Sequence, residues 1–154
     1  MYRLINLFFK VFIYSLYRHK YKLTKSFRFN GYFVRFNGEG SIKFGENCYV
    51  SFFTLLSTEK STKIICGNDV SIAHNVKIYT SGVNSDIKIR TGKDVTEYGD
   101  VVIGNNVLIG SHSFIKHGVR IGNNVIVGAN SLVTRDVPDN VVVVGVPAVV
   151  IKKW

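Results

Sequence analysis

Histidine is the side chain best suited to take up a proton near neutral pH, and two of the four histidines lie in segments that suggest such chemistry. His74 lies in IAHNVK and His112 in IGSHSF. Either could act as a general base, with Asp86 or Asp94 orienting its ring. Turns of this kind also hold histidines that only shape the backbone, so both residues are candidates. His19 belongs to the basic end of an N-terminal segment.

These histidines belong to a sequence that repeats every six residues. From Ile103 the units read IGNNVL, IGSHSF, IKHGVR, IGNNVI, VGANSL and VTRDVP, and related units begin at Phe44 and Cys66. The aliphatic first residue and the small or branched fifth residue are expected to point inward, while Gly-Asn pairs turn the corners. Three units make one turn, so the repeat predicts an all-β stack of triangular parallel coils.

The phase of the repeat assigns positions to individual side chains. His74 takes the third place in its unit, and Ser111 and Ala129 take the third place one and two coils later. Cys48 and Cys66 fall on inward positions, so we expect both to be core residues rather than redox groups.

The period is broken most strongly between Ile78 and Ile103, which predicts an external loop at about residues 80–101. A long loop in a compact repeat is usually functional. We expect the remainder, residues 31–154, to form one repeat domain that ends in a C-terminal cap.

The N-terminal segment, residues 1–30, differs in character. The first 38 residues carry eight Lys/Arg and no acidic residue, within a chain of net charge +10. Apolar side chains recur at helical spacing opposite Arg3, Asn6 and Lys10, at Leu4, Ile5, Phe8, Phe9, Phe12 and Leu16. This pattern predicts a short amphipathic helix that caps the coil, contacts an anionic membrane, or does both.

Several classes of protein do not fit the composition. The apolar runs of the N-terminal segment are too short for a membrane span, and no small-residue cleavage site of a signal peptide follows them. The two cysteines form no CxxC pair, which favours a cytoplasmic protein, with peripheral contact with the inner membrane face as an option. No nucleic-acid recognition motif accompanies the basic charge, so no nucleic-acid partner is expected.

Four segments carry a resemblance to a known family: GENCYVSF, CGNDVSIAHNVKIYTSG, IGNNVLIGS and IGNNVIVGANSLVTRDVPDNVVVVGVPA. Over about residues 44–153 they resemble the galactoside and maltose acetyltransferase group of hexapeptide-repeat enzymes. The resemblance implies a left-handed parallel β-helix, a homotrimer with active sites between subunits, and acetyl transfer from acetyl-CoA to a sugar hydroxyl. Relatives with a short basic N-terminus often modify capsule, O-antigen or other polysaccharide precursors, which would place the acceptor at the inner membrane surface.

The resemblance also implies contacts with the cosubstrate. Ser111 and Ala129 match the residues that line the pantetheine arm, and Thr134 and Arg135 match the pair near the adenine. Lys152 matches a basic residue that meets the phosphates of CoA, where a cation is physically favourable. The implied cosubstrate is acetyl-CoA, and no metal is expected.

The chain departs from the family at the catalytic position. The family's general base falls on Val83, and a family asparagine that holds the acceptor or the oxyanion falls on Ser51. A family phosphate-binding arginine falls on Val149. Ser51 and Asp86 are the candidate acceptor-binding residues. Because valine cannot accept a proton, either another base acts or the chain is a non-catalytic scaffold or sugar-binding relative.

A weaker alternative is a zinc enzyme. The spacing His112-x4-His117 resembles the paired zinc ligands of γ-type carbonic anhydrases, with His74 as the third ligand. The upstream Arg-x-Asp and Asn-x-Gln-Asp motifs of that family are absent.

Overall fold

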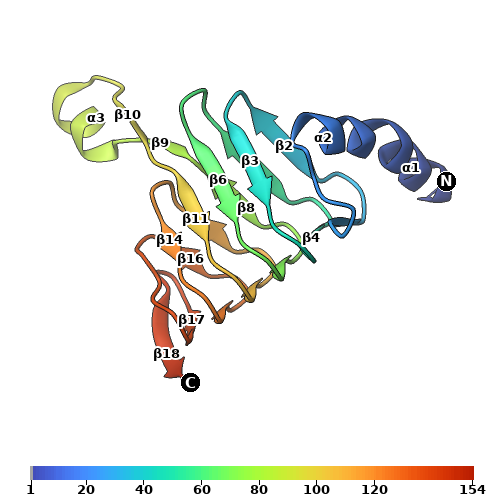
Figure 1. Ribbon diagram of the computed structural model, residues 1–154. Coiled ribbons are helices and arrows are strands. Elements are labelled where there is room, and N and C mark those ends of the chain that lie inside the picture. The colour runs from blue at the N-terminus through green and yellow to red at the C-terminus, as the bar shows by residue number, and fades with distance from the viewer. Residues whose placement is uncertain (1) are drawn as a thin grey trace.

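The computed structural model describes residues 2–154 as a stack of short parallel strands, with a helix at one end and a hairpin at one side (Figure 1). Each of the first four turns of the coil adds one strand to each of three walls, which we name sheets A, B and C. The architecture is the stack of parallel coils that the repeat predicted, in the form of the left-handed parallel β-helix that the resemblance implied.

Sheet A has seven strands: β1 (Arg28–Asn30), β4 (Tyr49–Ser51), β7 (Val70–Ile72), β12 (Val107–Ile109), β15 (Val125–Val127), β17 (Val141–Val144) and β18 (Val149–Lys153). Sheet B contains β2 (Arg35–Gly38), β5 (Leu55–Thr58), β8 (Lys77–Tyr79), β13 (Phe114–Ile115) and β16 (Leu132–Val133). Sheet C contains β3 (Ser41–Phe44), β6 (Lys63–Cys66), β11 (Val101–Ile103) and β14 (Arg120–Ile121). Only β18 runs against the others in these three sheets, and it closes the C-terminal end.

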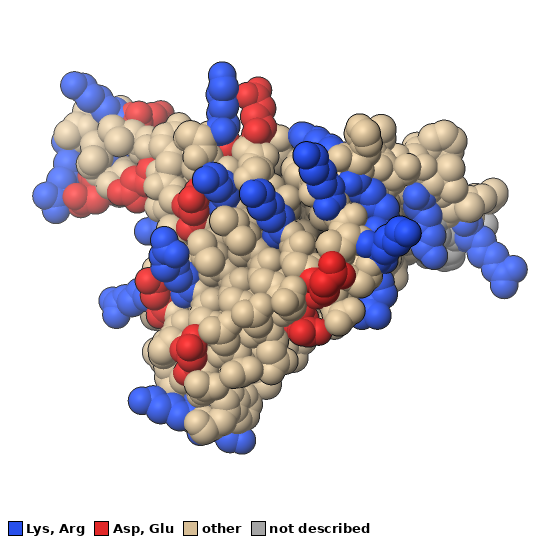
Figure 2. All heavy atoms as spheres, in the orientation of Figure 1, with Lys and Arg blue, Asp and Glu red and all other residues tan. Residues whose placement is uncertain are grey.

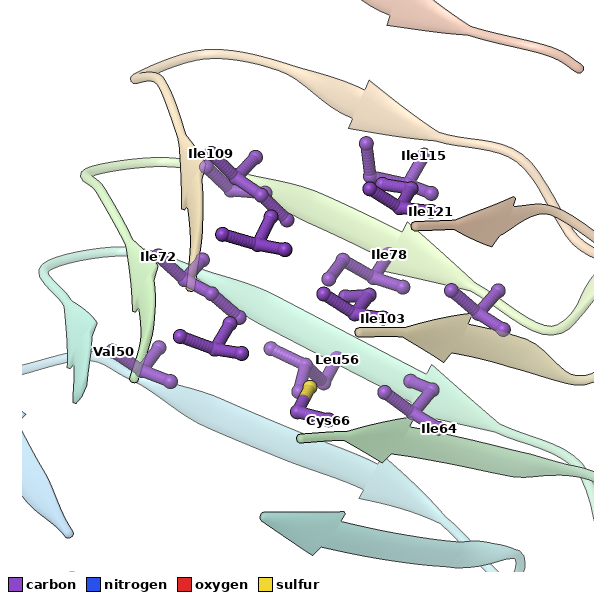
Figure 3. Packing of buried hydrophobic residues seen from close by; sticks show 14 of the residues in the cluster. Val50, Leu56, Ile64, Cys66, Ile72, Ile78, Ile103, Ile109, Ile115 and Ile121 are labelled. Carbon is purple, nitrogen blue, oxygen red and sulfur yellow. The ribbon is translucent and has the colours of Figure 1, made fainter. Parts of the chain in front are cut away.

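The core lies inside the triangle, as the period predicted. First-position residues of successive coils stack on one another, for example Val50, Ile72 and Ile109, which are paired in register and fully buried (Figure 3). Cys48 and Cys66 are free, buried thiols in this core, and burial raises the pKa of both. Their predicted core position is therefore confirmed.

Asparagines turn many of the corners with left-handed backbone angles. Asn106 and Asn124 each have a φ of 54°, and Asn140 has a φ of 60°. Their side-chain amides form a ladder: Nδ2 of Asn106 donates to Oδ1 of Asn124 over 2.9 Å, and Nδ2 of Asn124 donates to Oδ1 of Asn140 over 2.8 Å. Asparagine tolerates this backbone region better than most residues, which explains the repeated Asn at these turns.

The N-terminal helix caps the first coil. It runs through α1 (Tyr2–Phe8), a π-helical segment η1 (Phe9–Ile13) and α2 (Tyr14–Lys20). The buried Tyr14 stacks on Phe29 with ring centroids 4.0 Å apart, and its hydroxyl donates to the carbonyl of Gly31 over 2.8 Å. The stack begins at β1, slightly earlier than the boundary at residue 31 that the sequence suggested. No helix within residues 2–154 is long and apolar enough to cross a bilayer.

The helix packs through a different face from the one that the spacing suggested. Phe9, Ile13, Tyr14 and Tyr17 contact the coil. Most of the predicted apolar stripe points away from it, with exposed fractions of 52–72% at Leu4, Phe8, Phe12 and Leu16. Aromatic stacking on the first coil decides the orientation of the helix, because rings of Phe27, Phe29 and Phe36 already line that end.

The predicted external loop is an ordered hairpin. Strand β9 (Ser81–Val83) pairs antiparallel with β10 (Thr96–Tyr98), and helix α3 (Ser85–Thr91) lies between them. The side chain of Asn84 caps α3 by accepting from the backbone N–H of Ile87 over 2.9 Å, and Gly92 ends it with a φ of 69°. The hairpin leaves the coil between sheets B and C, away from the N-terminal helix (Figure 1).

Candidate functional site

Two corners flank sheet B and carry most of the candidate residues. At the AB corner the chain passes from sheet A to sheet B, for example between β12 and β13. At the BC corner it passes from sheet B to sheet C, and there the hairpin leaves between β8 and β11.

The AB corner holds the predicted column of third-position residues. The backbone N–H of His112 donates to the carbonyl of His74 over 2.9 Å, and that of Asn130 donates to the carbonyl of Ser111 over 2.9 Å. His74, Ser111 and Ala129 therefore lie one above another on successive coils, as the phase predicted. Ser111 is half-buried and Ala129 is exposed, so two small side chains lie at the surface of this corner.

Both candidate bases at the AB corner are exposed and already contact neighbouring side chains. The ring of His74 stacks on Phe52 with centroids 5.2 Å apart and an interplanar angle of 9°. His112 occupies a left-handed turn with a φ of 62°, and its Nδ1 lies 2.9 Å from Nδ2 of Asn75. These contacts fix the two rings in position. They pair neither ring with a carboxylate.

The loop carboxylates are engaged elsewhere. Asp86 pairs with Arg90 over 2.8 Å along α3, and Asp94 pairs with Lys88 over 2.7 Å. Both pairs lie inside the hairpin, which leaves from the BC corner. Within one chain they do not orient His74 or His112, contrary to what the sequence suggested.

The remaining predicted contacts are spread over the surface of the chain. Thr134 and Arg135 follow β16 at the BC corner, and Lys152 lies on β18 with its Nζ 4.7 Å from the ring centroid of Trp154. Ser51 is buried at the end of β4, directly before the Phe52 that stacks on His74. A single chain thus separates Ser111 and Ala129 from Thr134, Arg135 and Lys152.

A hollow of about 400 Å³ lies on the outer face of sheet B beside the AB corner. It is lined by the stacked rings of Phe33 and Phe53 and by Arg35, Asn75 and Lys77. Nζ of Lys77 donates to the carbonyl of Phe53 over 3.1 Å. Burial, followed by the nearby Arg35, lowers the pKa of Lys77. The hollow combines apolar and cationic groups, which suits a ligand with a ring and a negative charge.

The BC corner holds a histidine that we did not single out as a base from the sequence. His117 follows β13, and its Nε2 lies 3.7 Å from Oε2 of Glu97 on β10. Nδ2 of Asn84 donates to the other oxygen of Glu97 over 2.6 Å. The side chain of His117 is only 12% exposed, and burial followed by Lys116 lowers its pKa, against an opposing effect of Glu97.

The phase of the repeat contains a signal that could have identified His117. It holds the third position one coil after Thr80, at the corner where the loop departs. His117 therefore lies next to β9, which contains Val83, the residue that the resemblance placed at the family's catalytic position.

The zinc hypothesis is not supported by this arrangement. Among residues 2–154 no three His, Cys, Asp or Glu side chains are grouped so that they could hold a metal ion. His112 and His117 lie at different corners of sheet B.

Comparison with known proteins places this geometry in a family. Residues 100–135 match the family described as bacterial transferase hexapeptide (six repeats). The chain is 38% identical over 120 residues to a galactoside O-acetyltransferase of Escherichia coli (strain K12), covering 78% of this chain and 58% of that protein. It is 43% identical over 117 residues to Protein CapG of Staphylococcus aureus, covering 72% and 65%. The chain thus spans somewhat under two thirds of the length of these relatives.

Similarity to solved structures extends over more of the chain. A galactoside acetyltransferase in complex with coenzyme A superimposes with a TM-score of 0.71 and is 33% identical in sequence. The match covers 91% of this chain and 68% of that one. The repeat, the coil and these similarities together show that the chain belongs to the hexapeptide-repeat acetyltransferase family.

Proposed function

We propose that the protein is an O-acetyltransferase that moves the acetyl group of acetyl-CoA to a sugar hydroxyl of a surface-polysaccharide precursor. The observation that carries the proposal is the open column of Ser111 and Ala129 at the AB corner, in a fold that superimposes on a coenzyme A complex. Arg135 and Lys152 supply exposed cations suited to the phosphates of CoA. The similarity to a galactoside O-acetyltransferase supports a sugar acceptor.

A homotrimer is part of this proposal. Ser111 and Ala129 lie at the AB corner of a chain, whereas Thr134, Arg135 and the hairpin lie at its BC corner. A neighbouring copy that presents its BC corner to this AB corner would assemble both sets around one groove. A closed three-fold ring gives every copy the same pair of contacts.

The outer face of the N-terminal helix supports a membrane-bound acceptor. We define this outer helix face by six exposed apolar residues: Leu4, Leu7, Phe8, Val11, Phe12 and Leu16. Lys and Arg side chains gather over the helix and the first coils (Figure 2), in a segment that contains no acidic residue up to position 38. An apolar stripe flanked by cations complements the headgroup region of an anionic bilayer. Docking there would bring the enzyme to a lipid-linked glycan.

Vesicle binding tests the docking surface. We expect the protein to float with vesicles that contain phosphatidylglycerol, and to do so less at high salt, because screening weakens the attraction of the lysines. Replacing Leu4, Phe8 and Phe12 by Ser should reduce binding at least about tenfold, since each buried apolar side chain contributes about 1.5–3 kcal/mol. Ile89→Ser, on the exposed surface of α3, is the matched control. If the triple variant loses its oligomeric state in the absence of vesicles, the outer helix face instead contacts a neighbouring subunit.

An acetyl-transfer assay tests the activity. Purified protein is incubated with acetyl-CoA and with p-nitrophenyl β-galactoside, maltose or a UDP-linked hexose. We expect release of the CoA thiol together with an acetylated sugar, detected by mass spectrometry. Binding of CoA without transfer to any acceptor would favour the alternative, a scaffold or sugar-binding relative that has lost its base.

A further inference from the structure

We propose that His117, positioned by Glu97, is the general base of the acyl transfer and acts in place of the histidine that the family carries at the position of Val83. The inference rests on the proposed acetyltransferase function and assigns its central residue.

The position of His117 is the first reason. A Cβ atom on Gly82 would lie 3.0 Å from Cδ2 and 3.1 Å from Nε2 of His117, so the ring rests directly against the backbone of β9. Val83 is the next residue and is 50% exposed at the rim of the hairpin. An imidazole therefore lies on the coil immediately beside the strand that contains Val83. It lies at the corner where the resemblance places the base.

The partner of His117 is the second reason. Glu97 stands opposite Gly82 in the β9–β10 ladder, and its Oε2 lies 3.7 Å from Nε2 of the imidazole. Asn84 holds the other carboxylate oxygen over 2.6 Å and also caps α3, so the carboxylate is fixed by the hairpin. A carboxylate beside one ring nitrogen sets the tautomer and stabilises the cation that forms when the ring takes a proton. The distance is long for a hydrogen bond, and such contacts commonly shorten when substrate binds.

The electrostatic surroundings fit a base that is neutral at pH 7. Partial burial and the adjacent Lys116 lower the pKa of His117, while Glu97 raises it. The balance keeps the imidazole unprotonated near neutral pH and ready to accept a proton. His74 and His112 have Phe52 and Asn75 as their contacts, and neither residue can stabilise an imidazolium as a carboxylate does.

The chemistry follows from this orientation. With Nε2 turned toward Glu97, Nδ1 takes the proton of the acceptor hydroxyl while the oxygen attacks the thioester carbonyl of acetyl-CoA. A carbon–oxygen bond forms, the tetrahedral intermediate collapses, and the carbon–sulfur bond breaks. The departing thiolate takes the proton back from the imidazolium. The products are the sugar acetate and CoA, and His117 is regenerated.

Substitution of each histidine tests the assignment. In the transfer assay we expect His117→Asn to lower kcat about 100- to 1,000-fold with little change in the KM for acetyl-CoA, a typical loss for a general base. His19→Asn, on the basic end of α2, should retain full turnover. Loss of transfer in His74→Asn or His112→Asn, with transfer retained in His117→Asn, would overturn the proposal.

The pH profile separates a base from a residue that only supports the hairpin. Glu97→Gln keeps the shape of the side chain but removes the charge that raises the pKa of His117. The acid limb of kcat/KM should therefore move to lower pH in this variant, and the maximal rate should fall. An unmoved limb would show that the Glu97–His117 pair is structural only. If the unmodified protein binds CoA but transfers no acetyl group, the proposed function fails as well, whereas normal transfer by His117→Asn refutes the base assignment alone.

Discussion

The two corners of sheet B differ in how they are built. The AB corner repeats the same turn on successive coils, and its side chains stack in columns such as His74, Ser111 and Ala129. The BC corner is interrupted by a hairpin whose carboxylate, Glu97, approaches His117 of the next coil. Regular stacking aligns side chains along one edge of the coil, an arrangement suited to an extended cosubstrate. The inserted hairpin brings the carboxylate of Glu97 close to the imidazole of His117, two groups that an uninterrupted repeat would not place together. A proton-transfer site needs such a pair of titratable side chains.

The largest expected effect tests the core that supports the AB corner. Ile109 is fully buried on β12, so Ile109→Ala should lower the free energy of unfolding by about 3 kcal/mol or more, through lost burial and an unfilled cavity. Urea unfolding measures it. Ile89→Ala is the control, because Ile89 is 85% exposed on α3 and should cost less than about 0.5 kcal/mol. Equal losses would mean that the hairpin, like the coil, depends on a packed core.

A bulky side chain at position 129 should obstruct the groove at the AB corner. Ala129→Trp should raise the KM for acetyl-CoA at least about tenfold, which corresponds to about 1.4 kcal/mol, because the ring would fill the space beside Ser111. Steady-state kinetics and calorimetry with CoA measure the change. Leu108→Trp places the same ring on the outer face of sheet A and should leave the KM unchanged. An unaffected KM in Ala129→Trp would show that the column of Ser111 and Ala129 does not bind acetyl-CoA.

A smaller effect is expected from displacing the base at the BC corner. In Gly82→Ala the new methyl group would press on the ring of His117, and the imidazole must give way by a few tenths of an ångström. We expect kcat to fall about three- to tenfold, roughly 1 kcal/mol, with an unchanged KM for acetyl-CoA. Ser85→Ala, on the exposed start of α3, controls for disturbance of the hairpin. A change in the KM for acetyl-CoA with an unchanged kcat would indicate that the BC corner binds the cosubstrate and does not hold the base.

The smallest expected effect is on stability against pH. Because burial lowers the pKa of folded His117, the unfolded chain takes up the proton first, and stability should decline as the pH falls below about 6.5. His117→Asn removes this contribution. Its loss of stability between pH 7 and pH 5 should therefore be smaller than that of the unmodified protein. If urea unfolding shows the same loss of stability for both proteins between pH 7 and pH 5, the pKa of folded His117 is not lowered.

The coil was predictable from the sequence because a period of six maps directly onto inward and outward positions. The buried Ile72 and Ile109, and the alignment of His74 with Ser111 and Ala129, follow from phase alone. The external loop was also expected at about residues 80–101. Its internal order was not, although Asn84 and Gly92 are recognisable helix-capping residues.

Contacts between elements of different period could not be predicted. The pairing of Glu97 with His117 depends on the register of β9 with β10 and on how the hairpin leaves the coil. The six-residue period of the sequence gives no information about either. The face of the N-terminal helix was also not predictable from spacing. Stacking of Tyr14 on Phe29 outweighs the burial of the Leu4 and Phe8 stripe.

A complementation experiment tests most directly the claim that the two corners of sheet B, from neighbouring chains, form one active site. Ala129→Trp damages only the AB corner, and His117→Asn damages only the BC corner. Each variant alone should be nearly inactive at low acetyl-CoA. After the two are unfolded together and refolded, random trimers should recover about one quarter of the unmodified activity, because half of the copies carry each intact corner. Mixed trimers that stay inactive would contradict a site shared between chains with His117 as its base.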